Sequence, residues 1–383
     1  MNAIENSPGF DPSIDLGDGV RMPLVGCGTQ FGFCEDGHER GRPEHGAHYV
    51  AKALGVGFRM LDTARGYGTE THVMAGLAEA GVARRDAFVV SKAWVGVDHP
   101  PGLAASRAAI TESAARLGGH VDLFLVHQPV AGWQDLWRAL EDAKDAGHVR
   151  AIGVSNFGIA HLDELAGFAR HRPVANQIHL HPFVFEGHRD TIRACAERGI
   201  RIMAFPRTPW RLGPGTAIDS VAAECGITRA QVMLRWAVEH GFAVIPLSTD
   251  DRHLAENFAV RTLRLSPEQL ARIDRLAERP RVRYHVDEVT ATRISGWAFV
   301  TGSTLRIRVL AGDQVLGEAS HGQPRPDVQA AHSGAPEALA SGFAFTLPRD
   351  GFGAGQRQIT LSFETADHAT GATCILTVPS PDA

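Results

Sequence analysis

Residues 58–67 are Phe58-Arg59-Met60-Leu61-Asp62-Thr63-Ala64-Arg65-Gly66-Tyr67, a short apolar run followed by a polar turn. The pattern recurs where Ser91-Lys92 follows the apolar run 88–90 and where His127 follows the apolar run 123–126. Short apolar runs bounded by turn residues are typical of buried strands. If these strands are parallel neighbours, their carboxyl ends bring a carboxylate, a phenol, an ammonium and an imidazole together. The stretch therefore predicts a parallel sheet and a cluster of ionisable groups at its edge.

Strand-like runs alternate with helical stretches up to about residue 278. We predict strands at residues 23–27, 58–61, 88–91, 122–126, 151–154, 174–178, 201–204 and 243–246. Apolar residues recur at helical spacing most clearly in residues 70–79, 104–117, 133–146, 229–238 and 268–276. Eight strand–helix units in about 250 residues predict an α/β fold, a closed (β/α)8 or TIM barrel. Asp18-Gly19 between apolar residues predicts an N-terminal β-hairpin at the bottom of the barrel.

The helical pattern ends near residue 280. Short strand-like runs follow, with Gly, Asp and Pro between them, at residues 286–300, 305–310, 314–319, 342–347, 358–364 and 373–378. A segment of about 100 residues with this pattern predicts an all-β sandwich. We therefore expect two domains, a barrel over residues 1–280 and a β-sandwich over residues 281–383.

Composition excludes several classes of partner. The formal net charge is -5, which argues against nucleic acid or an anionic membrane as the main partner. No signal peptide is visible in residues 1–8, and no apolar run approaches membrane-spanning length. The cysteines are never spaced Cys-x-x-Cys, so we expect reduced thiols in a cytoplasmic protein; they are Cys27, Cys34, Cys195, Cys225 and Cys374.

The four ionisable groups suit the reduction of a carbonyl. That reaction needs a hydride donor and an acid for the developing alkoxide. A free tyrosine, with a pKa of about 10, is a poor acid near neutrality, and a nearby ammonium lowers that pKa. Lys92 would act in this way on Tyr67, while Asp62 would keep Lys92 charged and His127 would orient the carbonyl. Each residue alone also has a structural explanation, as a loop aromatic, a solvated lysine, a helix cap or a hydrogen-bonded histidine. The position of the four residues at successive strand ends favours a catalytic role over these structural explanations.

Six motifs carry a family resemblance. They are Met22-Pro23-Leu24-Val25-Gly26-Cys27-Gly28-Thr29, Leu61-Asp62-Thr63-Ala64-Arg65-Gly66-Tyr67-Gly68-Thr69-Glu70, Ser91-Lys92, Asp122-Leu123-Phe124-Leu125-Val126-His127-Gln128-Pro129, Ile152-Gly153-Val154-Ser155-Asn156-Phe157 and Asn176-Gln177-Ile178-His179-Leu180-His181-Pro182. In this order they resemble the aldo/keto reductase family over roughly residues 12–277, with Thr69 where the family usually has Asn. The resemblance implies NAD(P)H-dependent reduction of an aldehyde or ketone to an alcohol, with Tyr67 as general acid in a catalytic tetrad with Asp62, Lys92 and His127.

The same resemblance implies a nicotinamide site. Ser155, Asn156 and Gln177 would bind the carboxamide, although Ser155-Asn156 also fits a helix cap. Phe205 stands where the family usually stacks a tyrosine on the nicotinamide ring, and its π-face keeps that contact. The other implied cofactor-binding residues are Gly28, Thr29, Asp62, Ser248, Arg252, His253, Glu256 and Asn257.

The adenosine end departs from the family pattern. Leu247 and His253 stand where the family usually places the lysine and arginine that bind the 2′-phosphate of NADP(H). A histidine is mostly neutral at pH 7. Arg252 can substitute, since a guanidinium suits phosphate, and a helix starting after Thr249 would present its N-terminus. Glu256 and Asn257 fit a plain helix surface equally well. The sequence therefore leaves NADPH and NADH both open as the cofactor.

The substrate pocket is less well defined. We expect Gln30, Trp94 and His127 to line it, with Trp133 and Trp210 as weaker candidates. The Gly- and charge-rich residues 31–45 follow the first strand, at the active-site face of a barrel. They fit a cover over the substrate and a solvated loop equally well. The sequence does not identify which small-molecule carbonyl is reduced.

The C-terminal module has a resemblance of its own. Ile294-Ser295-Gly296-Trp297-Ala298-Phe299, Arg325-Pro326-Asp327-Val328 and Ser341-Gly342-Phe343-Ala344-Phe345 are similar to a β-sandwich appended to some bacterial glycosyltransferases and methyltransferases. We expect Trp297 in the core rather than on a sugar-stacking surface. The module's candidate roles are self-association, docking of a protein partner and shielding of the barrel's mouth.

Two other functions fit parts of the sequence. His179-x-His181 places two imidazoles on one face of a strand, as in a metal-dependent barrel hydrolase. No acidic ligand is convincingly placed with them, so we predict no metal. A cofactor-binding regulatory or scaffold protein without turnover would use the barrel for binding and the module as its output. The complete tetrad argues against a loss of catalysis.

Overall fold

The computed structural model describes residues 13–31, 43–206, 216–278, 282–300, 304–311, 314–332, 336–348, 358–365 and 370–379. The chain forms two compact units, and the division between them falls between Ala277 and Glu278.

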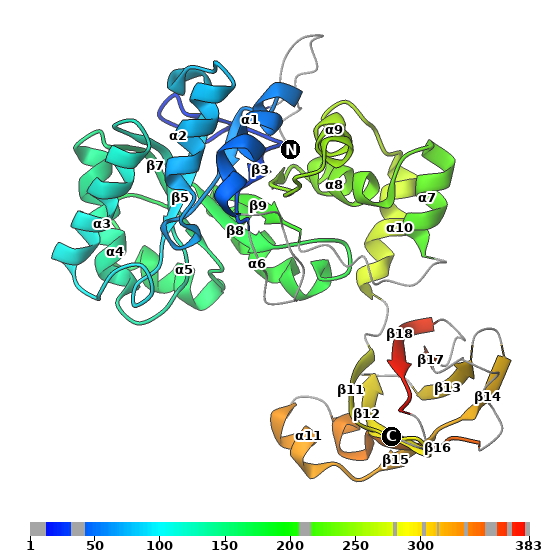
Figure 1. Ribbon diagram of the computed structural model, residues 1–383. Coiled ribbons are helices and arrows are strands. Elements are labelled where there is room, and N and C mark those ends of the chain that lie inside the picture. The colour runs from blue at the N-terminus through cyan, green and yellow to red at the C-terminus, as the bar shows by residue number, and fades with distance from the viewer. Residues whose placement is uncertain are drawn as a thin grey trace. The chain divides into compact units, whose positions relative to one another are not determined.

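The first unit contains an eight-stranded parallel sheet, in which each strand pairs with the next along the chain (Figure 1). The strands are β3 (Cys27–Gly28), β4 (Met60–Asp62), β5 (Phe88–Ala93), β6 (Val121–Val126), β7 (Val149–Ser155), β8 (Ala175–His179), β9 (Arg201–Phe205) and β10 (Ala243–Val244). The sheet closes on itself because Val25 pairs with Val244, whose carbonyl accepts a 2.8 Å hydrogen bond from the Gly26 amide. The predicted (β/α)8 barrel is confirmed.

Helices surround the barrel (Figure 1). They are α1 (Gly46–Val56), α2 (Glu70–Glu79), α3 (Leu103–Arg116), α4 (Trp133–Asp145), α5 (Ile159–Ala166), α6 (Phe185–Glu197), α7 (Ala217–Cys225), α8 (Arg229–Glu239), α9 (Asp251–Ala259) and α10 (Pro267–Glu278), with 3₁₀ turns η1 (Pro43–His45), η2 (Arg65–Tyr67) and η3 (Arg84–Asp86). Their buried faces pack on the outer side of the strands in one large apolar core. A second core fills the barrel's interior.

The N-terminal hairpin closes one end of that interior. Strands β1 (Ser13–Asp15) and β2 (Arg21–Pro23) pair antiparallel, as predicted. Leu16, Val20 and Met22 pack in one cluster with Met60 and Phe88, which begin β4 and β5. The hairpin thus covers the amino ends of the strands and leaves their carboxyl ends for chemistry. It also takes up Met22 and Pro23, so the first barrel strand begins at Cys27 rather than at the predicted Pro23.

The second unit is a sandwich of two four-stranded antiparallel sheets, which confirms the predicted β-sandwich. One sheet contains β11 (Val282–Val289), β12 (Arg293–Val300), β16 (Gly342–Thr346) and β15 (Ser320–Gln323), and the other β14 (Gln314–Glu318), β13 (Leu305–Ala311), β17 (Gln358–Thr365) and β18 (Thr370–Thr377). Side chains from both sheets share one core, among them Ile294, Phe343, Val309 and Leu361.

Three details of this unit differ from the sequence prediction. The run 286–300 is two strands, because the Thr290 hydroxyl accepts the Arg293 amide at 3.0 Å and turns the chain. A helix, α11 (Pro326–Ala331), and a 3₁₀ turn, η4 (Pro336–Ala340), lie between β15 and β16. Trp297 is half-buried against a small separate cluster of Phe299, Val328 and Ala338, outside the sandwich core.

Within the described ranges, no helix is both long and apolar enough to cross a membrane. Free thiols are found at Cys27, Cys195, Cys225 and Cys374. Trp210, Cys34 and most of the 31–45 segment lie outside the described residues.

Candidate active site

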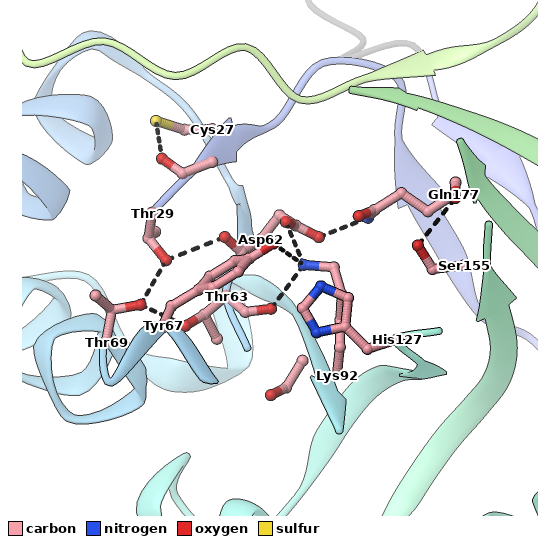
Figure 2. Close-up of polar contacts among 12 residues, drawn as sticks. Cys27, Thr29, Asp62, Thr63, Tyr67, Thr69, Lys92, His127, Ser155 and Gln177 are labelled. Carbon is pink, nitrogen blue, oxygen red and sulfur yellow. Dashed lines mark hydrogen bonds and ion pairs between the residues drawn. The ribbon is translucent and has the colours of Figure 1, made fainter. Parts of the chain in front are cut away.

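The four predicted catalytic residues meet at the carboxyl ends of neighbouring strands (Figure 2). Asp62 ends β4 and Tyr67 ends the turn η2 that follows it. Lys92 lies near the end of β5, and His127 directly follows β6. Because β4, β5 and β6 are adjacent and parallel, these ends share one face of the barrel.

Lys92 is the centre of this cluster. Its side chain is fully buried, and its Nζ donates to Asp62 Oδ1 at 2.6 Å, to the Thr63 carbonyl at 2.9 Å and to the Tyr67 hydroxyl at 3.4 Å. Burial lowers the pKa of Lys92, but the Asp62 carboxylate and the Tyr67 hydroxyl outweigh it, and the net shift is upward. An ammonium has three protons, and all three have acceptors here. The Tyr67 oxygen accepts one of them, so its own proton points away from the ammonium and can be directed at a ligand.

The second oxygen of Asp62 connects the tetrad to the predicted nicotinamide site. Gln177 Nε2 donates to Asp62 Oδ2 at 2.7 Å. The Ser155 hydroxyl donates to the main-chain carbonyl of Gln177 at 2.9 Å, and Asn156 Nδ2 donates to Ser155 Oγ at 3.0 Å. Asn156 has a φ of 61°, the left-handed region that asparagine tolerates better than most residues. Amide and hydroxyl groups thus gather beside the acid–base cluster, which is the chemistry that a carboxamide ligand requires.

His127 lies edge-on to Tyr67, with ring centroids 5.6 Å apart, and its ring is 5.3 Å from that of Trp94. Burial and the charge on Lys92 lower the pKa of His127 to about 3. The imidazole is therefore neutral near pH 7. Its Nδ1 is buried and has no hydrogen-bond partner among the residues that the structure describes. A neutral imidazole can donate an N–H hydrogen bond to a substrate oxygen, and its low pKa keeps it from taking up a proton itself.

Comparisons with known proteins identify the family of this chain. The profile of the aldo/keto reductase family matches residues 30–209 and 206–278. An uncharacterized oxidoreductase of Bacillus subtilis (strain 168) is 36% identical over 274 residues, which cover 70% of this chain and 93% of the relative. The chain belongs to the aldo/keto reductase family. It is an NAD(P)H-dependent oxidoreductase with the family's barrel.

Other relatives of this aldo/keto reductase cover a similar part of the chain. A glyoxal reductase of the same bacterium is 34% identical, covering 72% of this chain and 97% of the relative. A solved aldo/keto reductase from Brucella melitensis aligns with a TM-score of 0.63 and 31% identity, over 70% of this chain and all of the other. The Bombyx mori aldo-keto reductase, solved in complex with NADP, aligns with a TM-score of 0.62 and 28% identity, over 69% of this chain and 92% of the other.

The remaining predicted site residues surround the same end of the barrel. Gly28 ends β3 and Thr29 follows it, and their amides donate to the carbonyls of Pro246 and Asp62, respectively. Gln30 and Trp94 are half-buried. Phe205 ends β9, with its ring 5.7 Å from that of His179. Phe31 is buried, and its ring lies 5.2 Å from that of Tyr49. Trp133 packs on Phe157 in the outer core, away from the barrel's interior.

The predicted adenosine end of the cofactor site lies at the start of α9. Asp250 caps the helix by accepting the His253 amide at 3.0 Å, and Ser248 Oγ accepts the Asp250 amide at 3.1 Å. Arg252 is 77% exposed, and its Nε lies 3.7 Å from Glu256 Oε1. Asn257 is buried, whereas Glu256 is only half-buried. Leu247 lies over Gly28, where it offers no charge to a phosphate.

Lys52 is a cation at this end that sequence reasoning missed. It extends from α1, donates to the Thr249 carbonyl at 3.1 Å and pairs with Asp251 at 2.7 Å. Nothing in the sequence connects two segments so far apart along the chain. The pairing places the Asp251 carboxylate directly beside the Lys52 ammonium.

Two further features concern nucleophilic and metal chemistry. The Cys27 thiol lies near Asp62, and burial together with that carboxylate raises its pKa to about 12, so it is not a nucleophile. Among the described residues, no group of three or more His, Cys, Asp or Glu side chains could hold a metal ion. His179 and His181 instead pack edge to face, with centroids 4.9 Å apart.

The neutral state of His127 predicts how stability depends on pH. An unfolded histidine titrates near 6.5, so between about pH 6.5 and pH 3 the unfolded chain binds one proton more than the folded chain. The stabilisation is complete above pH 6.5 and is lost as the pH falls towards 3. From pH 8 to pH 5 we expect His127 to account for a loss of about 2 kcal/mol. Urea unfolding of the wild type and of His127→Gln at both pH values measures it.

An exposed histidine provides the control for this experiment. His148, exposed between α4 and β7, should give a His148→Gln variant with the wild-type pH dependence. Equal pH dependence in the wild type and His127→Gln would contradict a neutral, buried His127.

Proposed function

We propose that this chain reduces an aldehyde or ketone to an alcohol with NAD(P)H, with Tyr67 as the general acid. The observation that carries the proposal is the set of three hydrogen bonds that Lys92 donates, to Asp62, to the Thr63 carbonyl and to the Tyr67 hydroxyl. This arrangement makes Tyr67 an acceptor towards Lys92 and directs its own proton away from the ammonium, towards a substrate.

Each tetrad residue then has a distinct task. A nicotinamide held at this site would supply the hydride for the carbonyl carbon. Tyr67 gives its proton to the oxygen as negative charge develops there, and the Lys92 ammonium stabilises the phenolate that remains. Asp62 keeps Lys92 charged and in place. His127, neutral and beside Tyr67, donates a ring N–H to the same oxygen. Solvent returns a proton to Tyr67 after the alcohol leaves.

Ser155, Asn156 and Gln177 would hold the carboxamide of the cofactor. Asn156 donates to the Ser155 hydroxyl, which donates to the main-chain carbonyl of Gln177, while the side-chain amide of Gln177 is held by its bond to Asp62. Phe205, half-buried at the end of β9, supplies an aromatic face at the same end of the barrel. Trp94, in contact with His127, would line the substrate side together with Gln30.

A panel of aldehydes and ketones tests the proposed reaction. The loss of nicotinamide absorbance measures the oxidation of NADPH or NADH, and the alcohol product should be identified separately. Stoichiometric alcohol formation is the expected result. Tight cofactor binding with no turnover of any carbonyl would favour a regulatory or scaffold function instead.

We further propose that NADH and NADPH bind with similar affinity. Lys52 and Arg252 bring two positive charges to the adenosine end, but Asp251 and Glu256 lie beside them at 2.7 and 3.7 Å. Asp250 adds a further negative charge at the start of α9. A 2′-phosphate therefore gains little net attraction at this end of the site.

Fluorescence titration measures this preference. We expect the two dissociation constants to differ by less than about tenfold. Asp251→Asn should release Lys52 and tighten NADPH binding several-fold, with NADH unchanged. Asp190→Asn is the matched control, because Asp190 is a similarly exposed carboxylate paired with Arg193 on α6. NADPH binding a hundredfold tighter than NADH in the wild type would contradict the proposal.

We also propose that residues 281–383 are an accessory domain, joined near residue 280 to a barrel domain of residues 1–280. The division between Ala277 and Glu278 supports this boundary. Self-association or docking of a protein partner through this domain is compatible with its separate core.

A further inference from the structure

Three buried threonines form a chain of hydroxyl groups behind the tetrad (Figure 2). Thr63 Oγ1 lies 2.8 Å from Thr69 Oγ1, and Thr69 Oγ1 lies 3.0 Å from Thr29 Oγ1. Thr29 Oγ1 donates to the main-chain carbonyl of Asp62 at 3.0 Å. All three side chains are shielded from solvent. The chain therefore links Thr29, which follows β3, to the loop between β4 and α2.

The direction of every hydrogen bond in this chain is fixed. A threonine hydroxyl has a single proton. Thr29 uses its proton on the Asp62 carbonyl, so Thr69 must donate to Thr29. The proton of Thr69 is then used, so Thr63 must donate to Thr69. Thr69 is the one hydroxyl of the three that both receives from and donates to another threonine.

Thr69 could have used its hydroxyl differently. It occupies the N-cap of α2, where a threonine side chain commonly accepts a hydrogen bond from the first turn of the helix. Here the side chain makes no such bond. The next residue, Glu70, is buried and accepts the Ser91 hydroxyl at 2.7 Å, which fixes the start of α2 against β5. The hydroxyl of Thr69 is directed towards the tetrad loop and not towards its own helix.

The chain ends on the groups that hold Lys92. The Asp62 carbonyl accepts both the Thr29 amide, at 2.9 Å, and the Thr29 hydroxyl. Thr63, the other end of the chain, provides the carbonyl that accepts from Lys92 at 2.9 Å. Two of the three acceptors of Lys92, the Asp62 carboxylate and the Thr63 carbonyl, thus belong to the segment that the threonine chain secures.

We propose that Thr69 is a positioning residue for the reduction, whose hydroxyl holds the Asp62-Thr63 segment so that the Lys92 ammonium stays directed at the Tyr67 oxygen. The proposal rests on the proposed function of Tyr67 as general acid. It explains why a threonine suits this position in this chain, since a single hydroxyl fits between those of Thr29 and Thr63.

Thr69→Val tests this role, because valine keeps the shape and removes the hydroxyl. We expect kcat to fall about tenfold or more, as small misplacements in an active site commonly cause, while the cofactor Kd stays within about twofold. With Lys92 less well placed, the phenolate of Tyr67 is less stabilised, so the basic limb of the kcat–pH profile should move to higher pH. Thr69→Ser should restore both the rate and the profile. His127 and Asp98, which face the Tyr67 loop, are unchanged in both variants.

Thr71→Val is the matched control, because Thr71 is exposed on the same helix and should keep wild-type kcat and pH profile. If Thr69→Val does not fold, Thr69→Ala removes the hydroxyl without placing a new methyl among polar groups. A hydroxyl-free variant with wild-type kcat and profile would overturn the inference, as would a Thr69→Ser variant as impaired as Thr69→Val. Either outcome, together with normal turnover by the wild type, would overturn the role of Thr69 and leave the proposed function intact. A wild type that reduces no carbonyl would overturn both the role of Thr69 and the proposed function.

Discussion

Tyr67→Phe is expected to abolish most turnover while the cofactor still binds. The substitution removes one hydroxyl and keeps the ring that packs edge-on against His127. Without the hydroxyl, no group stands between the Lys92 ammonium and the substrate oxygen to deliver a proton. General acid catalysis by a positioned side chain contributes about 10²- to 10⁴-fold, so kcat should fall by this factor. Steady-state kinetics on the best carbonyl substrate and fluorescence titration of the cofactor measure the two effects separately.

Tyr284→Phe is the matched control for this experiment. Tyr284 lies in the β-sandwich and is one of only three tyrosines in the chain. Its ring stacks on that of Phe363, with the ring centroids 4.4 Å apart. The same loss of a hydroxyl there should leave kcat unchanged. If Tyr67→Phe retained the wild-type rate, Tyr67 would not be the acid, and the cluster around Lys92 would require another explanation.

The barrel could be predicted because its strands are buried on both sides. Residues 88–90 and 123–126 are continuous apolar runs, and such runs separated by amphipathic helices leave few alternatives to a parallel sheet. The ends of elements were less predictable. The first strand is shortened because Met22 and Pro23 pair with β1, a contact set by the hairpin and not by local composition.

The tetrad was predictable for a related reason. Asp62 and Tyr67 share one loop, and Lys92 and His127 follow the next two strands, so strand order alone brings them together. The pairing of Lys52 with Asp251 and the chain from Thr63 through Thr69 to Thr29 depend on side-chain directions across distant segments. The neutral state of His127 depends on burial, which its neighbours in sequence do not reveal.

Lys92→Met should reduce both stability and activity, and the two losses can be separated. The Asp62–Lys92 pair is buried, with 4% and 0% of the two side chains exposed. Removing the ammonium leaves the Asp62 carboxylate buried, with Gln177 as its remaining side-chain donor among the bonds described. Breaking a buried ion pair in this way costs about 3–5 kcal/mol of the free energy of unfolding. Urea unfolding of the barrel, followed by tryptophan fluorescence, measures this loss. Arg107→Met is the control, because the exposed Arg107–Asp142 pair should contribute less than about 1 kcal/mol.

The double variant Asp62→Asn/Lys92→Met distinguishes a structural from a catalytic role. The uncharged amide that replaces the Asp62 carboxylate can still accept from Gln177, and the isolated charge is gone, so most of the lost stability should return. Activity should not return, because no cation remains to stabilise the phenolate of Tyr67. Recovery of both stability and kcat would mean that Lys92 serves the fold alone. Recovery of stability without kcat would mean that the ion pair contributes little net stability and serves the chemistry of Tyr67.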